Sequence, residues 1–182
     1  MDAPAVTLRP VAGEDISLLE RFCVEPELMG LDWQGFHDRG SIRRRFDEDG
    51  FLGDKDGQLM VIANGHPAGF VAWREFTYAR ERDACWNIGI ILLPEWRGRG
   101  VGSSAQQQLA DYLFTYTPAV RIEAGALPEN IAEQRALERA GFTREGTLRH
   151  IVFGRGAWCD NVLYSRVRTD PMIMKPFDST VT

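Results

Sequence analysis

The chain has 182 residues, of which 44% are hydrophobic and 26% are charged, as in ordinary globular domains. This length fits one domain that can bury a substantial core, so extensive disorder is not expected. The formal net charge of −5 and the pI of about 5.3 disfavour a surface built for nucleic acid or for an anionic membrane.

The cysteines and the first residues indicate the compartment. Cys23, Cys85 and Cys159 lie far apart and form no C-x-x-C pair, which argues against a disulfide framework or a zinc site. The opening MDAPAVTLRP lacks the basic and apolar stretches of a signal peptide. No apolar run approaches the roughly 18 residues of a membrane span. We therefore expect a cytoplasmic protein with no metal, no nucleic-acid partner and no membrane partner.

In the first half of the chain, hydrophobic spacing predicts mostly strands. Alternation predicts a strand over residues 6–9, and helical spacing predicts a helix over 14–22. The irregular sequence of residues 25–50 indicates a loop and one short helix, with Arg43, Arg44 and Arg45 on a solvated face. Further strands are expected over 59–64, 67–77 and 85–93, separated by Asn64-Gly65 and by the charged segment 79–83.

The second half predicts two helices among strands. Apolar residues at helical spacing predict a helix over 101–116, and residues 131–140 predict another, closed by Gly141. Strands are expected over 120–126, 148–153 and 161–167, the last two as a hairpin around GRGAW. The fold class is thus α+β, with a mixed, mostly antiparallel sheet of about six to seven strands and flanking helices. Residues 1–182 form a single domain, with a core at about 6–169 and a loosely ordered tail at 170–182.

A glycine-rich segment at residues 97–102, RGRGVG, connects a predicted strand to a predicted helix. Glycine side chains leave the main chain open to a ligand, and successive N–H groups at a helix start bind anions. Arg97 and Arg99 add positive charge. The segment predicts a phosphate or pyrophosphate site; a turn that only caps the helix is the alternative that this motif leaves open.

Two common nucleotide motifs fit this segment poorly. A lysine-bearing phosphate loop requires a lysine that the segment lacks. A dinucleotide fingerprint requires a third glycine where Ser103 stands, although Glu123 lies at the distance of a ribose-binding acid. Many strand-like residues precede the segment and no second mononucleotide-binding half follows it, which disfavours a dinucleotide-binding domain.

A second segment, ENIAEQRALERAGFTREGTLR, places Asn130 at a helix start and Gly141-Phe142 at its end. Together with RGRGVG and the late strand WCDNVLYSRV, it resembles the GCN5-related N-acetyltransferase (GNAT) superfamily. The likeness is greatest to the branch that acetylates ribosomal proteins and assorted small amines. It spans about residues 6–169, and RGRGVG matches the family's [QR]-x-x-G-x-[GA] signature for the coenzyme A pyrophosphate. The resemblance implies a GNAT-like fold with a splayed central pair of parallel strands.

The resemblance also implies the coenzyme site. Strand residues would line the pantetheine and the thioester with their main chain, the glycine-rich turn would hold the pyrophosphate, and an asparagine would bind the pantetheine arm. An N-cap for the asparagine and a buried strand for the apolar residues are compatible alternatives. The expected residues are Ile90, Ile91, Leu92, Arg97, Gly98, Arg99, Gly100, Val101, Gly102, Ser103 and Asn130.

The catalytic residues are harder to assign. An alkyl amine has a pKa of about 10.4, so a base should assist its attack on the thioester. Family positions that often hold a tyrosine or an acid here hold Leu137, Asn87 and Gly125. Asn87 could orient a water, or be an ordinary amide on a strand face. Glu133 could act near the thiol, or be a solvated carboxylate in the first turn of a helix.

Acceptor recognition is expected in the region between the first helices and in the late hairpin. Aromatic residues there either line a pocket or pin the loop to the core, and an acid is available to an ammonium group. The candidates are Asp32, Trp33, Phe36 and His37, with His150, Arg155 and Trp158 on the hairpin. Glu75, on the strand expected over 67–77, is another candidate, either as a base or as part of an exposed cross-strand ion pair.

The expected activity is that of an acyl-CoA-dependent N-acyltransferase, with acetyl-CoA as the donor. The acceptor is a primary amine of a small molecule or of a peptide N-terminus, which attacks directly in a ternary complex. A succinyl donor is another reading, because Arg74 and Arg155 could meet its carboxylate. The missing acid and base favour a different alternative, an acyl-CoA-binding module without catalysis. Acetylation of a ribosomal protein is the third, and the sequence leaves the oligomeric state open, a homodimer included.

Overall fold

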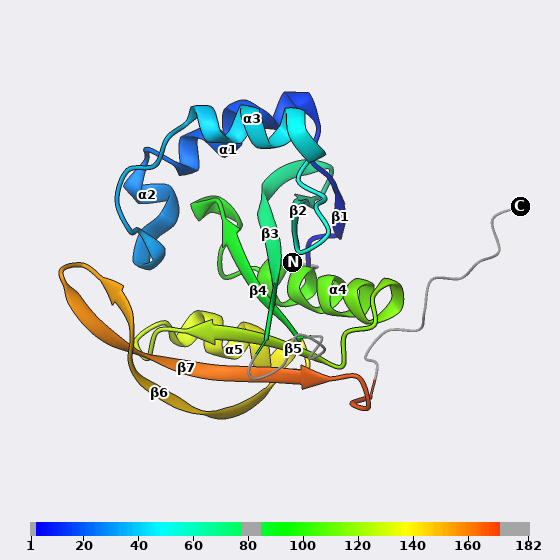
Figure 1. Cartoon of the computed structure of the whole chain (residues 1–182), viewed down its shortest axis with the longest axis vertical. Helices are drawn as coiled ribbons and strands as arrows, with labels where there is room; N and C mark the ends of the chain where they lie inside the picture. Colours follow the sequence, from blue (N-terminus) through cyan, green and yellow to red (C-terminus); the bar gives the residue numbers. More distant parts are fainter. Residues whose placement is uncertain (1–2, 78–84, 172–182) are drawn as a thin grey trace, which may run out of the picture.

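The computed structural model describes residues 3–77 and 85–171, which fold around one seven-stranded sheet (Figure 1). The strand order is β1-β2-β3-β4-β5-β7-β6, and β4 and β5 run parallel while the other neighbouring pairs are antiparallel. The predicted α+β class with a mixed, mostly antiparallel sheet is confirmed. The strands are β1 (Val6–Pro10), β2 (Asp56–Ala63), β3 (His66–Phe76), β4 (Cys85–Leu92), β5 (Arg121–Ala126), β6 (Thr143–Gly154) and β7 (Ala157–Val167).

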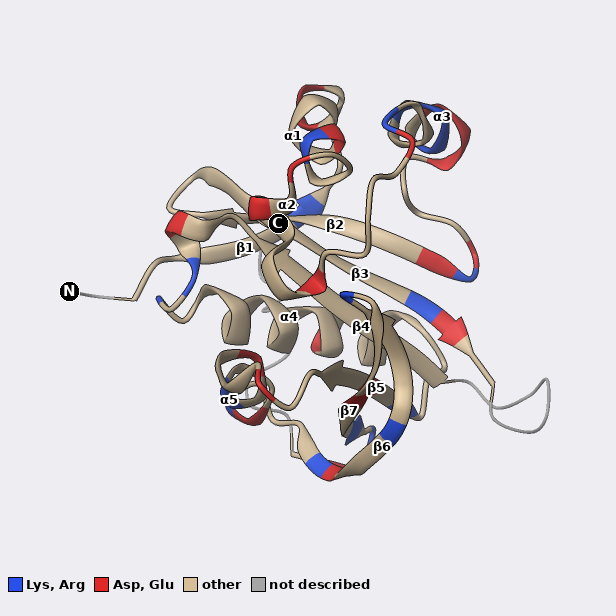
Figure 2. Cartoon of the chain, turned by 90° about the vertical axis from the view of Figure 1, so that its left-hand side faces the viewer, with Lys and Arg blue, Asp and Glu red and all other residues tan. Residues whose placement is uncertain are grey.

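Helices cover both faces of the sheet. One face carries α1 (Ile16–Phe22), α2 (Pro26–Met29) and α3 (Gly40–Asp49), and the other carries α4 (Val101–Tyr116) and α5 (Ile131–Arg139), as Figure 2 shows from the side. Short 3-10 turns are η1 (Gly13–Asp15), η2 (Gly30–Asp32) and η3 (Pro94–Trp96). Within the described residues, no helix is long and apolar enough to cross a membrane.

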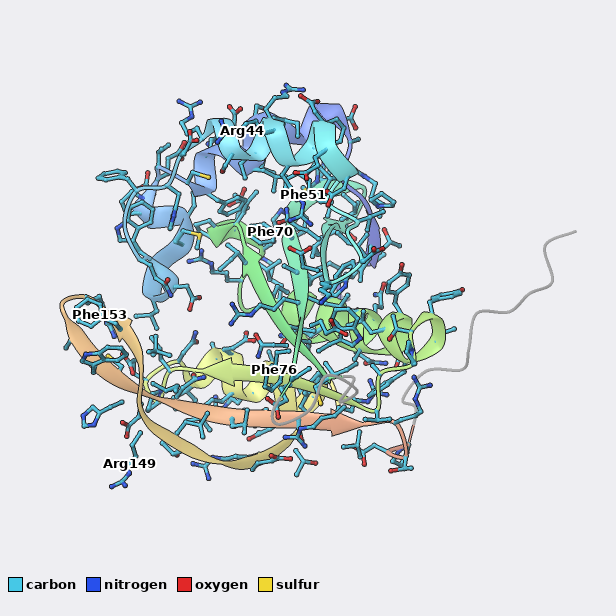
Figure 3. All side chains as sticks on the ribbon, viewed as in Figure 1. Arg44, Phe51, Phe70, Phe76, Arg149 and Phe153 are labelled. Carbon is cyan, nitrogen blue, oxygen red and sulfur yellow. The ribbon has the colours of Figure 1, made fainter. Side chains whose placement is uncertain are left out.

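Each face has its own hydrophobic core. On one, Leu109 and Leu113 of α4 pack against buried residues of the central strands such as Ile122. On the other, Phe22 of α1 packs edge-on against Phe70 of β3, with ring centroids 5.3 Å apart; Figure 3 shows Phe70 pointing toward the helices. Each fully buried side chain of this size contributes about 1.5–3 kcal/mol, so both layers are held firmly to the sheet.

The observed elements differ most from the predicted ones in two places; in addition, β2 and β7 begin three and four residues earlier than predicted. Residues 25–50 hold α2, η2 and the ten-residue α3 instead of one short helix. The late hairpin begins at Thr143, five residues earlier than predicted, because β6 is an edge strand whose first residues are exposed and lack an apolar pattern. Residues 79–83 and the tail from 172 onward lie outside the described residues.

The geometry that matters most is the separation of β4 from β5. These strands pair only between Cys85–Ile88 and Arg121–Ala124, although β4 continues to Leu92. Residues 89–92 stay paired with β3, up to the contact between Gly69 and Leu92. The main chain of this part of β4 therefore has no β5 partner on its other side. The resulting gap opens toward the N-terminus of α4.

Candidate active site

A cavity of about 380 Å³ fills the gap where β4 leaves β5. Three groups of residues line it: the end of β4, the turn before α4 and the first turns of α5, with the end of α2 closing one side. The lining residues from the predicted coenzyme site are Ile90, Ile91, Leu92, Arg97, Gly98, Gly100, Gly102, Ser103 and Asn130. The fold thus brings together two segments, around residues 97 and 130, that lie far apart in the sequence.

The turn before α4 presents bare main chain to this cavity. Gly100 is the N-cap of α4 at φ 83°, a left-handed conformation that favours glycine, and no side chain caps the helix. The first N–H groups of a helix have no partner within it, and the helix dipole places positive charge there. A Cβ added at Gly100 would meet no atom within 4 Å, so the space above the turn is open. This arrangement suits a phosphate group.

The two arginines of the turn are held differently. The guanidinium of Arg97 donates to the carbonyl of Leu92 at 2.8 Å and also to that of Leu28, which ties the turn to α2. Arg99 lies over the ring of Trp96, with its guanidinium carbon 5.9 Å from the ring centroid, and does not line the cavity. Arg97 therefore contributes both charge and a fixed geometry, whereas Arg99 remains at the rim.

Asn130 caps α5 and lines the cavity at once. Its Oδ1 accepts a hydrogen bond from the N–H of Glu133 at 3.2 Å, the usual N-cap interaction. The amide nitrogen of the same side chain remains available to donate to a ligand. The two interpretations of this residue, cap and ligand-binding group, are compatible in the structure.

Two carboxylates, Glu133 and Asp32, line the same cavity, and the charge of Asp32 acts on Glu133. Burial and the negative charge of Asp32 raise the pKa of Glu133, a hydrogen bond from Gln106 opposes the rise, and the resulting pKa is about 7. Asp32 lies at the end of η2 with an exposed surface, but the protein around it reduces its hydration and raises its pKa, while Arg97 opposes that shift. Their environments thus favour protonation of both groups.

Several carboxylates elsewhere in the described chain have a lowered pKa. Arg121 and Ser165 bind Glu145 and lower its pKa to about 2. Among described Asp and Glu residues with a resolved shift, only Asp32 and Glu133 have a raised pKa. Titratable groups perturbed by burial and by a like charge inside a cleft are typical of functional sites.

A second cavity, of about 330 Å³, adjoins the first on the face that carries α1–α3. Leu31 and Asp32 line both cavities and so stand at their junction. The loop residues Trp33 and Gln34 and the tip of the β6–β7 hairpin form its walls, and Figure 1 shows that α2 and this hairpin tip lie on the same side of the molecule. The floor comes from Arg74, Asn87, Gly125 and Asn161.

Gly125 explains one departure from the family pattern. A Cβ at this position would lie 2.1 Å from the amide nitrogen of Asn161 on β7, so this side chain already occupies the space. A carboxylate at position 125 could not be accommodated without moving Asn161. Amides of Asn87 and Asn161 replace acids on this part of the floor.

The structure does not bring all predicted acceptor residues into these two cavities. Phe36 is 78% exposed and packs on Trp33, while His37 is exposed and also lies outside both cavities. Glu75 lies near Lys55, with 3.9 Å between the charged atoms, as in an exposed cross-strand pair. Leu137, at the position of the family's tyrosine, is fully buried in the core.

Of the residues at the site that were not singled out from the sequence, three bear directly on its shape or charge. Leu31 forms the junction beside Asp32, Gln106 contacts Glu133 from inside α4, and Asn161 covers Gly125. A polar residue at a position that the helix pattern buries, as Gln106 is, could have signalled a functional contact. Leu31 and Asn161 carry no such signal, because their neighbours come from distant segments. The described residues contain no group of three or more His, Cys, Asp or Glu side chains that could hold a metal ion.

The sequence matches a known family over most of its length. Residues 5–143 match the family model described as "Acetyltransferase (GNAT) domain". A curated relative, the probable N-acetyltransferase YjcK of Bacillus subtilis, is 36% identical over 83 residues, which cover 46% of each protein. The alignment thus spans about half the length of this relative.

Solved structures share the fold over nearly the whole chain. Spermidine N-acetyltransferase from Vibrio cholerae, in complex with CoA and spermine, has a TM-score of 0.78 at 19% identity, covering 91% of this chain and 96% of that one. Ribosomal-protein-S5-alanine acetyltransferase from Vibrio fischeri has a TM-score of 0.74 at 19% identity, covering 93% and 98%. Structures of both the polyamine and the ribosomal-protein type are thus similar in fold.

Proposed function

Because the chain belongs to the GNAT family of N-acetyltransferases, we propose that it moves the acetyl group of acetyl-CoA to a primary amine of a small molecule or of a peptide N-terminus. One observation carries the proposal: the cavity at the diverging strands and the cavity on the opposite face meet at Leu31 and Asp32. Donor and acceptor can therefore occupy separate spaces that share one opening, as direct transfer in a ternary complex requires.

The residues of the larger cavity fit coenzyme A. The uncapped start of α4 and the open space above Gly100 suit the pyrophosphate, and Asn130 offers a donor for the amide-rich pantetheine arm. Main-chain groups of residues 90–92, on the side of β4 that β5 does not pair, would meet the thioester end. A backbone N–H there can stabilise the negative charge that develops on the carbonyl oxygen.

The reaction requires three proton movements. The acceptor ammonium loses one proton before its nitrogen attacks the acetyl carbon; the new C–N bond forms, the C–S bond breaks, the nitrogen releases a second proton to solvent to give the neutral amide, and the departing sulfur takes up a proton. Two carboxyl groups whose environments differ can divide the first and the last of these tasks between them.

The geometry supports one assignment of roles. Asp32 lines both cavities, and Arg97 opposes the rise of its pKa, so it is the group to hold the ammonium and accept its proton. Glu133 lines only the donor cavity, and its pKa of about 7 keeps a large protonated fraction at neutral pH. We assign to Glu133 the protonation of the sulfur and to Asn87 the positioning of a water on the acceptor side.

The acceptor is proposed to be small. The second cavity holds about 330 Å³, and the hairpin tip and the loop at residues 31–34 close it on two sides. The net charge of −5 alone would attract a basic ribosomal protein only weakly and gives no local binding surface for one. A polyamine, such as the spermine bound in one structural neighbour, would meet a single carboxylate, Asp32, among the lining residues.

The test is the release of free thiol from acetyl-CoA across a panel of amines, with the acetylated product identified by mass spectrometry. The panel contains alkylamines, polyamines, amino acids and short peptides with a free N-terminus. Acetylation of at least one small amine, saturable in both substrates, is the expected result. Protein that binds CoA tightly but acetylates only a protein N-terminus would contradict the small-molecule proposal.

A further inference from the structure

We infer that the acceptor amine carries a carboxylate, which Arg74 binds on the floor of the acceptor cavity. This inference rests on the proposed function, since it names the substrate class of that same site. Arg74 is the one Lys or Arg of β3 and lies two residues before the end of the strand.

Arg74 occupies a central place in the groove. It lines the 330 Å³ cavity and also a further cavity of about 400 Å³ that extends below α3. Asn87 is the other residue common to both, and it lies directly opposite Arg74 in the pairing of β3 with β4. Residues directly opposite in a sheet share a face, so both side chains stand on the same floor. The groove therefore continues from Asp32 past Arg74 into a third space.

The charge of Arg74 is not neutralised by the described protein. Its two arginine neighbours in these cavities are paired: Arg45 binds Asp49 at 2.8 Å and Asp56 at 2.7 Å, and Arg155 binds Glu129. No ion pair involves Arg74 within residues 3–77 and 85–171. An unpaired guanidinium on a concave floor is suited to bind a carboxylate with two parallel hydrogen bonds.

The groups around Arg74 are mainly hydrogen-bond donors. One carboxylate, Asp56, lies directly opposite Arg74 on β2 and lines the adjoining cavity, but it is bound by Arg45 at 2.7 Å. Asn87 and Asn161 contribute side-chain amides to the acceptor cavity. In the adjoining cavity, the Nε2 of Gln58 is buried without a hydrogen-bond partner. Asp32, at the far end of the acceptor cavity, is its single acidic lining residue. One end of the groove thus suits an ammonium group and the other suits an anion.

A carboxylate could also arrive on the donor, as the terminal group of a succinyl chain. Arg74 does not line the cavity that we assign to the coenzyme, and the space beyond it leads away from that cavity. These placements favour a carboxylate on the acceptor. The two sources are separated by giving the enzyme succinyl-CoA with a simple alkylamine.

The experiment measures kcat/KM with acetyl-CoA for ω-amino acids of increasing chain length, each beside its carboxamide. The amide keeps the amine and the length but removes the charge. A hydrogen-bonded charged pair should favour one acid over its amide by about ten- to a hundredfold. Arg74→Gln should abolish this preference, Arg74→Lys should restore part of it, and Arg74→Glu should favour diamines instead. Arg149→Gln is the control, since Arg149 is exposed and points away from the body of the protein in Figure 3.

The outcomes separate this inference from the proposed function. Equal values for acids and amides in the wild type, with normal acetylation, overturn the inference alone. Succinyl transfer that depends on Arg74, without a preference among acceptors, also overturns it. If no amine is acetylated, the proposed function fails. Calorimetric titration of the same acids into CoA-saturated protein then tests whether Arg74 binds their carboxylate. Binding that Arg74→Gln removes supports the inference, and binding that survives the substitution contradicts it.

Discussion

The two sides of the proposed active-site cleft are built in different ways. On the donor side, the cavity exposes main chain at the unpaired edge of β4, the glycine turn and the start of α4, beside side chains of α2, η2 and α5. On the acceptor side, the cavity is formed by side chains from β3, β4, β7, the loop after η2 and the hairpin tip. Asp32 belongs to both.

This difference indicates which side of the cleft can change its ligand specificity by substitution. Main-chain amides cannot be altered by substitution, so a donor site made of them accepts one kind of ligand in many sequences. Side chains on separate elements can be exchanged one at a time while the sheet persists. We therefore expect substitutions on the donor side to act only where they block the main chain, and those on the acceptor side to act through the chemistry of the side chain.

The strongest test of the donor side is Gly102→Asp. A Cβ at this position would make ordinary contacts, the nearest at 3.7 Å to Leu92, and a carboxylate in the first turn suits the helix dipole, so the fold should persist. Like charges about 4 Å apart near a protein surface repel by about 4 kcal/mol, so affinity for CoA should fall by about a hundredfold or more. Calorimetry measures this. Gly102→Ala, the matched control, should bind nearly as well; unchanged affinity in the aspartate variant would refute the assigned pyrophosphate site.

Glu133→Gln should lower kcat by about a hundredfold, because it removes the proposed proton donor to the sulfur. Affinity for CoA should stay within a few-fold. Since Glu133 must be protonated to act and its pKa is about 7, kcat/KM of the wild type should fall above about pH 7. The variant should lose this alkaline limb. If kcat/KM of Glu133→Gln still falls above about pH 7, the fall is caused by another group.

Asp32→Asn tests the residue that both sides share. Loss of the group that holds the ammonium and accepts its proton should lower kcat/KM for the amine by at least tenfold, while the affinity for CoA remains. The negative charge of Asp32 raises the pKa of Glu133, so its removal should shift the alkaline limb to lower pH. Steady-state kinetics at several pH values measure both effects. A limb that moved to higher pH would contradict the coupling between these carboxylates.

The smallest effect is expected for Ser103→Ala. The hydroxyl of Ser103 donates to the carbonyl of Gly100 at 3.0 Å, so its removal leaves the main-chain amide of this residue in place. CoA affinity should change by less than about threefold, the range of one modest hydrogen bond. A large loss in calorimetric titration would mean that the hydroxyl itself contacts the ligand, and would weaken the contrast between the two sides.

The elements that line the donor cavity could be predicted from the sequence, for a physical reason. Glycines, a helix start and an asparagine N-cap leave local signals, and the helix predicted over residues 101–116 is α4. The order of elements and the class of sheet follow from hydrophobic spacing in the same way.

The acceptor side could not be predicted to the same extent. Trp33 and Asp32 were expected there and do line the cavity, but Phe36, His37 and Glu75 lie outside it. The contact of Asn161 with the space at Gly125 depends on the pairing of β5 with β7, which no local pattern encodes. Likewise, the raised pKa of Glu133 depends on Asp32, about a hundred residues away in the sequence.

The central claim is that main-chain amides at the start of α4 bind the coenzyme while the acceptor side stays free. Amide hydrogen exchange, followed residue by residue with and without acetyl-CoA, tests it most directly. We predict the largest slowing at residues 98–104, with little change at the tip of the β6–β7 hairpin. Protection concentrated at that tip, with unchanged exchange at the start of α4, would contradict the account.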